Sequence, residues 1–115
     1  LIDYLDGVPA NPNDVIPTGN IAGPKMKNDN GWNNSENGTN SSGFSALPGG
    51  KRSGFDTNFA DIGEIGYWWS STEYSKNKVY GRSILPNTHY GIKDGRICED
   101  VQFKESGFSV RCLRD

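Results

Sequence analysis

The chain has 115 residues, a net charge of −2 and 33% hydrophobic residues, which is the size and composition of one globular domain. Its basic residues form no dense patch, so nucleic acid is excluded as the default partner. No run of about 18 apolar residues occurs, which excludes a membrane-spanning helix in this segment. Asn, Gly and Ser are abundant, so long helices are not expected after the first residues.

The first residues carry the pattern of a helix end. Leu1, Tyr4 and Leu5 fall at helical spacing, and Gly7 stands where a C-terminal cap is expected. Prolines and asparagines then exclude regular structure over residues 9–17. We expect this segment to be the last part of an element that began upstream.

A long polar loop is predicted at residues 28–42, NDNGWNNSENGTNSS, after a short apolar patch at 21–26 that we expect to be a loop or brief strand. Trp32 is the only aromatic residue in the loop and serves either as a lid over the core or as a platform for a ligand. Three asparagines match the N-glycosylation pattern, as chance alone provides in an Asn-rich loop: Asn33, Asn37 and Asn40.

The same loop offers oxygen atoms to a calcium ion. Asp29, Glu36 and Asn37 supply carboxylate and amide groups, yet they are scattered and form no Asp-x-Asp-x-Asp-Gly sequence. Calcium is therefore kept only as an alternative to an ion-free loop, and no metal site is assigned.

Residues 43–65 are rich in glycine and are predicted to be loops and turns. Lys51 follows two glycines, as in a phosphate-binding loop, but Arg52 stands where that loop needs Ser or Thr. Pro48-Gly49-Gly50 is better interpreted as a turn. The apolar residues of the following loop are Phe55, Phe59, Ile62 and Ile65.

The second half of the chain predicts an antiparallel sheet. Residues 66–72, GYWWSST, carry the clearest strand pattern, aromatic and rich in hydroxyl groups. Successive side chains of a strand face opposite ways, so only one of Trp68 and Trp69 can belong to the core. Further strands are expected at 79–85, 89–93 and 96–103, with turns at Pro86-Asn87 and Asp94-Gly95.

A last strand is predicted at residues 108–113. Alternation places Phe108, Val110 and Cys112 on the core face and Ser109 on the other. The other cysteine is Cys98, and the two lack the second pair that zinc would need. A disulfide between Cys98 and Cys112 would contribute around 3 kcal/mol through loop closure, and two buried thiols are the alternative.

No catalytic constellation emerges from the sequence. His89 is the only histidine and lies near a predicted turn, and no nucleophile-elbow sequence supplies a serine. No spacing singles out a pair among the carboxylates Asp56, Asp61, Glu64, Glu73, Glu99 and Asp100. The sequence therefore predicts a binding or structural module with no catalytic residues, not an enzyme.

Three segments carry a resemblance to a known family: GFSALPGGKRSG, GYWWSST and GFSVRCLRD. In this order they resemble the Fibrobacter succinogenes major paralogous domain, a bacterial extracellular module related to the C-type lectin-like fold. The segment YLDG…IAGPKMK…GW also fits, so the likeness spans residues 1–115 as a single domain. The resemblance implies an α+β, C-type lectin-like fold that is loop-rich, with a small antiparallel β-sheet and little helix.

The chain departs from the family in two places. Family members carry an upstream half of which only LIDYLDG stands here, so the resemblance implies that the N-terminal part of the fold is missing. The strand at 108–113 would then lack a neighbour, and its exposed edge predicts a homodimer. The second departure is Cys98, because a partner for the Arg-Cys of the last strand is less regular at this position.

The resemblance also implies a function at the bacterial surface. It predicts a secreted or surface-anchored protein, held by a lipid anchor or signal outside this segment, which adheres to a glycan or a surface protein. No cofactor is implied: the calcium-binding tripeptides of familiar lectins are missing, and related copper oxidases need an active-site cysteine pair. A purely structural module of a surface fibre or lipoprotein is the alternative.

The predicted ligand-binding residues are an aromatic and amide set. They come from the polar loop and from the strand at 66–72: Trp32, Asn33, Asn34, Asn37, and either Trp68 or Trp69. A tryptophan ring would stack on a sugar face, and amide groups would bond its hydroxyls.

Overall fold

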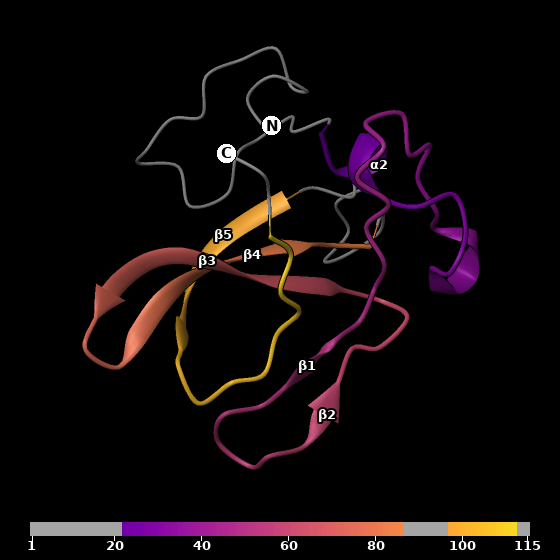
Figure 1. Cartoon of the computed structure of the whole chain (residues 1–115). Helices are drawn as coiled ribbons and strands as arrows, with labels where there is room; N and C mark the ends of the chain where they lie inside the picture. Colours follow the sequence, from indigo (N-terminus) through magenta and orange to yellow (C-terminus); the bar gives the residue numbers. More distant parts are fainter. Residues whose placement is uncertain (1–21, 87–96, 113–115) are drawn as a thin grey trace.

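The computed structural model (Figure 1) places a small antiparallel sheet beside a long region of loops, and we describe residues 22–86 and 97–112. The helical elements are α2 (Ala22–Met26) and the 3-10 turn η1 (Asn33–Ser35). The strands are β1 (Lys51–Arg52), β2 (Phe59–Ala60), β3 (Gly66–Ser75), β4 (Lys78–Ile84) and β5 (Ile97–Phe103). The loop-rich α+β architecture with little helix is thus confirmed.

The main sheet has the order β3-β4-β5, and both pairs are antiparallel. Gly66, Ile84 and Ile97 stand side by side at one end of it. The strands predicted at 66–72, 79–85 and 96–103 are therefore confirmed, and β3 extends three residues further than expected, to Ser75. A second, two-stranded sheet pairs β1 with β2.

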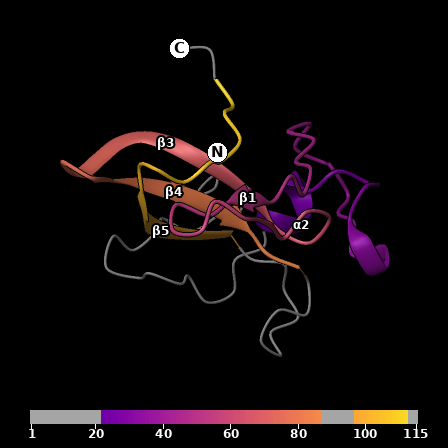
Figure 2. The same ribbon diagram turned by 90° about the horizontal axis from the view of Figure 1, so that it is seen from below.

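The core lies between one face of the main sheet and the loop region. Figures 1 and 2 show α2 and the polar loop at the end of the sheet where β3 begins and β4 ends. At this end Ile84 and Ile97 are buried, and Trp68 packs against them from β3. The buried cluster consists of Ala22, Met26, Trp32, Ala46, Ile84 and Ile97, with Phe44 and Trp68 packed against it.

The glycine that opens β3 makes room for the Trp68 ring. Both residues point to the same face, and a Cβ atom at Gly66 would lie 2.2 Å from the Trp68 ring. Trp68 therefore folds back over Gly66 and meets Phe44 edge-on, with ring centroids 6.1 Å apart. The Gly-Tyr-Trp order of the strand thus fixes the position of the Trp68 ring.

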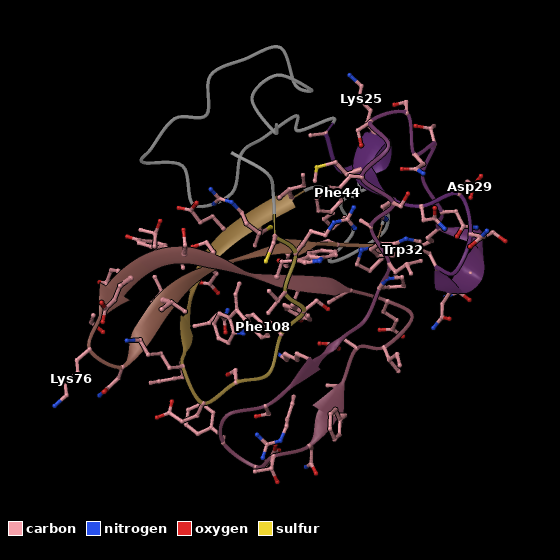
Figure 3. All side chains as sticks on the ribbon, in the orientation of Figure 1. Lys25, Asp29, Trp32, Phe44, Lys76 and Phe108 are labelled. Atoms are coloured by element: carbon pink, nitrogen blue, oxygen red, sulfur yellow. The ribbon has the colours of Figure 1, made fainter. Side chains whose placement is uncertain are left out.

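The opposite face of β3 carries a column of three stacked rings. Phe108 stacks on Tyr67 and on Trp69, with centroid distances of 5.1 and 4.3 Å. Figure 3 shows Phe108 between the sheet and the loop that follows β5. Gly81 stands opposite Trp69, and its missing side chain leaves space for the Phe108 ring.

The strand predicted at 108–113 is wrong over its described residues, 108–112. Only Ser109 pairs with β3, exchanging backbone hydrogen bonds with Tyr67 and Trp69. The chain then leaves the sheet, and Val110 is 73% exposed instead of facing the core. Alternation failed here because a single bridge does not impose the period of a strand.

The apolar patch before the polar loop forms the helix α2, not a loop or strand. Lys27 N–H donates to the Gly23 carbonyl at 2.9 Å. Pro24 lies in the first turn, where its missing N–H is tolerated. The predicted helix end at residues 1–7 and the strand at 89–93 lie outside the described residues, as do His89 and Asp94-Gly95.

Candidate functional site

Trp32 is a core residue, and its ring is 5% exposed. Its indole N–H donates to the Ala46 carbonyl at 3.1 Å, and its backbone N–H donates to Asn37 Oδ1 at 2.9 Å. Of the two roles predicted for Trp32, the structure therefore favours the lid over the core. Neither Trp32 nor the engaged Asn37 oxygen presents itself to a ligand.

Lys27 is buried beside Trp32 and has no exposed surface. Its ammonium donates to the Glu36 carbonyl at 3.3 Å and lies 4.3 Å from the centroid of the Trp32 ring. Burial lowers the pKa of Lys27 to about 8, although the negative charge of Glu36 acts in the opposite direction. Sequence reasoning missed this residue, because nothing in the string KMK distinguishes Lys27 from Lys25.

The polar loop predicted at residues 28–42 is confirmed, and its backbone is fastened to residues 24–28. Thr39 donates to the Pro24 carbonyl and Asn40 to the Lys27 carbonyl, at 2.9 and 3.0 Å. At its outer end η1 leaves Asn33 and Asn34 exposed. These two are the members of the predicted amide set that face solvent.

Amide oxygens of this loop are used by the protein itself. Asn40 Oδ1 accepts from Ser45 N–H at 2.8 Å, and Asn28 Oδ1 is 3.5 Å from Asn40 Nδ2. Within residues 22–86 and 97–112, no three His, Cys, Asp or Glu side chains gather closely enough to hold a metal ion. The alternative of a calcium site therefore gains no ligand cluster in this part of the chain.

The two strand tryptophans divide as the sequence predicts, one on each face of β3. Trp68 belongs to the core, and Trp69 lies half-buried against Phe108. Trp69 is therefore the strand tryptophan that remains a candidate for ligand contact. It lies on the face opposite the core, and it is not brought together with Trp32.

The predicted disulfide between Cys98 and Cys112 is not formed. Cys98 lies on β5, whereas Ser109 is held against β3 at the opposite edge of the sheet. Three strand spacings, about 14 Å, separate Ser109 from β5, which exceeds the reach of a disulfide. Cys112 continues from Ser109 into an exposed position instead of turning towards β5.

We expect the unreduced, denatured chain to yield both of its thiols in a titration with a thiol-specific chromophore. In the folded chain the exposed Cys112 should react before the half-buried Cys98, because reactivity requires access. Cys112→Ser should remove the fast phase and Cys98→Ser should preserve it. A denatured, unreduced chain that yields no thiol would show that a disulfide exists.

In the described residues, the three segments that carry the family resemblance thus contribute the loop that lines the core, strand β3, and Phe108, whose ring stacks on β3. The sequence model of a protein family, the Fibrobacter succinogenes major domain, matches residues 1–114. The chain belongs to this family. No match was found among curated proteins or among solved structures.

This Fibrobacter succinogenes major domain also displays an apolar surface that the sequence did not predict. Phe55, Phe59 and Ile62 are 85%, 83% and 78% exposed, and we call these three residues the hairpin surface. Phe59 lies on β2, Phe55 precedes this strand in the loop that connects it to β1, and Ile62 follows it. Glycine and asparagine neighbours made the segment appear to be an ordinary loop, which concealed its exposed apolar side chains.

Local hydrogen bonds close the tip of this hairpin. Ser53 N–H donates to the Asn58 carbonyl at 2.8 Å, and Asn58 N–H donates to Asp56 Oδ1 at 3.0 Å. The latter bond, together with smaller contributions, lowers the pKa of the Asp56 carboxyl. Phe55 directly precedes Asp56 and meets Phe103 edge-on, with ring centroids 5.4 Å apart.

The base of the hairpin is attached to both other parts of the domain. Tyr67 of β3 donates its hydroxyl to Asp61 Oδ2 at 2.8 Å. Asn33 N–H donates to the Gly63 carbonyl at 2.8 Å, which places η1 beside the end of the hairpin surface. Hydrogen bonds thus tie the base of the hairpin both to β3 and to the exposed amides of η1.

No helix in the described ranges is long and apolar enough to cross a membrane.

Proposed function

We propose that this domain is an extracellular or bacterial cell-surface binding module that adheres to a surface protein through the hairpin surface. The observation that carries the proposal is the exposure of three large apolar side chains within eight residues, Phe55, Phe59 and Ile62. Several large exposed apolar side chains on one element commonly mark an interaction site, whereas apolar residues that are scattered singly over a surface do not.

Docking of this surface would release a useful amount of free energy. Burying a Phe or Ile side chain contributes about 1.5–3 kcal/mol. The hydrogen bonds of Ser53 and Asp56 hold the backbone of the hairpin tip, which reduces the backbone entropy that binding would cost. A rigid apolar projection suits a groove on a partner protein.

A protein partner fits the surface better than a glycan does. Carbohydrate sites are usually concave and combine ring faces with several converging polar groups. Here the exposed apolar side chains project outwards, and two predicted stacking residues, Trp32 and Trp68, belong to the core. A glycan site would depend on Asn33, Asn34 and the half-buried Trp69.

The C-type lectin-like fold and the location of the protein are parts of the same proposal. A long loop region set on a small antiparallel sheet supports the fold, and the location follows from the extracellular character that the family resemblance implies. We propose that an anchor or signal outside this segment holds the protein at the cell surface.

Single substitutions on the hairpin surface are expected to weaken adhesion of the fluorescently labelled domain to intact bacterial cells. Phe55→Ser, Phe59→Ser and Ile62→Ser should each reduce binding about tenfold, since each removes roughly 1.5 kcal/mol of apolar burial. Tyr74→Ser is the matched control, because Tyr74 is 56% exposed but lies on the distal part of β3. All variants should unfold at the temperature of the unchanged domain.

Treatment of the cells separates the two kinds of partner. Protease should abolish binding, and periodate, which destroys glycans, should leave it intact. Binding lost with periodate and found on a glycan array would overturn the protein partner in favour of a glycan. No binding to cells, glycan arrays or insoluble polysaccharides would overturn the binding function and favour a purely structural module.

A further inference from the structure

Two Asn–Gly dipeptides, called steps below, occur in the polar loop, and they differ in hydrogen bonding and in exposure. Asn–Gly is the dipeptide in which a backbone amide most readily attacks a side-chain amide, because glycine has no side chain to obstruct the approach. The steps are Asn30-Gly31 and Asn37-Gly38, seven residues apart.

The step at Asn37-Gly38 is locked. Asn37 Oδ1 accepts from Trp32 N–H at 2.9 Å, and Gly38 N–H donates to the Asn28 carbonyl at 3.0 Å. A Cβ atom at Gly38 would lie 2.3 Å from the Pro24 carbonyl oxygen, so the glycine backbone is packed against α2. The attacking Gly38 N–H would have to break its hydrogen bond, and the packed glycine backbone would have to move, before its nitrogen could reach Asn37 Cγ.

The step at Asn30-Gly31 is open. Both residues are exposed, and the Gly31 N–H has no hydrogen-bond partner among residues 22–86 and 97–112. Asn30 Oδ1 accepts a hydrogen bond from Asn28 Nδ2 at 3.0 Å. A donor on this oxygen draws electrons from Cγ and stabilises the negative charge that develops when a nucleophile attacks there.

We propose that Asn30 is a site of spontaneous, site-selective deamidation in the folded protein. The Gly31 backbone nitrogen loses its proton to solvent and bonds to Asn30 Cγ, while the Cγ–Nδ2 bond breaks and ammonia leaves. Water then opens the resulting succinimide at either carbonyl, which gives aspartate or isoaspartate. No oxidation or reduction takes place, and the only co-reactant is water.

The product changes the entrance to the loop. A new carboxylate appears beside Asp29, and the isoaspartate form adds a methylene group to the backbone two residues before the buried Trp32. Asn28 Nδ2 retains an acceptor, because a carboxylate accepts the same hydrogen bond. The modification therefore adds negative charge to an exposed segment and leaves the core contacts of Trp32 in place.

Peptide mapping tests the proposal with an internal control. The folded chain is aged at mildly alkaline pH, then denatured, cut with trypsin and analysed by mass spectrometry with fragmentation. Cleavage after Lys27 and Lys51 places both Asn–Gly steps in one peptide. We expect Asn30 to deamidate at least about tenfold faster than Asn37, because the Gly38 N–H must first break its hydrogen bond to the Asn28 carbonyl. In urea the two rates should be nearly equal.

Two variants sharpen the result. Asn30→Gln should abolish the early mass gain, since glutamine would have to form a larger ring. Asn28→Ala should slow it by removing the donor to Asn30 Oδ1, while the rates in urea stay unchanged. Equal rates at Asn30 and Asn37 in the folded chain, or no deamidation at Asn30 while both react in urea, would overturn the proposal.

Discussion

Raising the pH from 8 to 10.5 is expected to increase the free energy of unfolding by roughly 3 kcal/mol through Lys27 alone. In the folded chain the buried ammonium loses its proton near pH 8, whereas in the unfolded chain it keeps the proton until near pH 10.5. Between these values the unfolded state binds more protons, so the stability rises with pH. Below pH 8 the full cost of burying the charge is present.

Lys27→Met should remove this dependence. Methionine preserves most of the buried stem, has no charge to desolvate and removes the hydrogen bond to the Glu36 carbonyl. Urea unfolding of both proteins at pH 8 and at pH 10.5 gives the difference directly, and other titrating groups cancel in the comparison. Lys76→Met is the control, because Lys76 points away from the domain at the tip of the β3–β4 hairpin (Figure 3).

A second substitution separates charge from packing. Compared with Lys27→Met, Lys27→Ala should cost about 2–4 kcal/mol, since both variants lack the charge and only the alanine empties the space that the stem fills beside Trp32. If Lys27→Met and the unchanged domain gain the same stability between pH 8 and 10.5, then Lys27 is not the group responsible.

The sheet could be predicted from the sequence because its residues repeat a local rule. Gly66, the aromatic residues after it and the hydroxyl residues at 70–72 all favour one extended strand, and β3 forms where they stand. The division of Trp68 and Trp69 between two faces follows from the same alternation. Local propensity and tertiary packing agree at these positions.

The rest depended on contacts between distant segments. The burial of Lys27 follows from the way residues 36–40 fold back over α2, and no local pattern encodes this return. The chain leaves the sheet after Ser109, because this residue makes only a single bridge to β3. The alternation of side chains in the sequence does not reveal how many residues will pair. The disulfide prediction failed for the same reason: the separation of Cys98 and Cys112 in sequence gives no information about sheet edges.

The hairpin surface was missed because exposure is the exception for large apolar side chains. Sequence reasoning assigns a Phe or Ile to the interior by default. The three residues of the hairpin surface are exposed instead. The hydrogen bonds of Ser53, Asp56 and Asp61 hold the hairpin backbone in place without these apolar side chains entering the core. The short polar side chains at turn positions do predict a turn here, but they do not predict that the apolar side chains beside them are exposed.

Trp32→Ala is expected to destabilise the domain by about 3–5 kcal/mol, which is the largest single effect we predict. The ring fills the centre of the buried cluster and supports the Lys27 ammonium at 4.3 Å. A loss of this size is a large share of the 5–15 kcal/mol that hold a typical domain together. Urea unfolding followed by circular dichroism measures it, and a variant that fails to fold counts as the extreme of the same result.

Two further substitutions are compared with Trp32→Ala. Trp32→Phe tests the indole N–H apart from the ring, and Trp69→Ala tests whether any tryptophan of the domain has the same effect. Trp32→Phe should cost about 1 kcal/mol from the lost hydrogen bond, plus the smaller ring. The Ala46 carbonyl still accepts the Asn28 N–H at 2.9 Å, and the backbone bond to Asn37 is unchanged. Trp69→Ala should cost less than Trp32→Ala, because Trp69 is only half-buried and Phe108 covers it on the far side of the sheet. If Trp69→Ala proves the more damaging of the two, then the core of this domain is centred on the stacked rings of β3 and not on the polar loop.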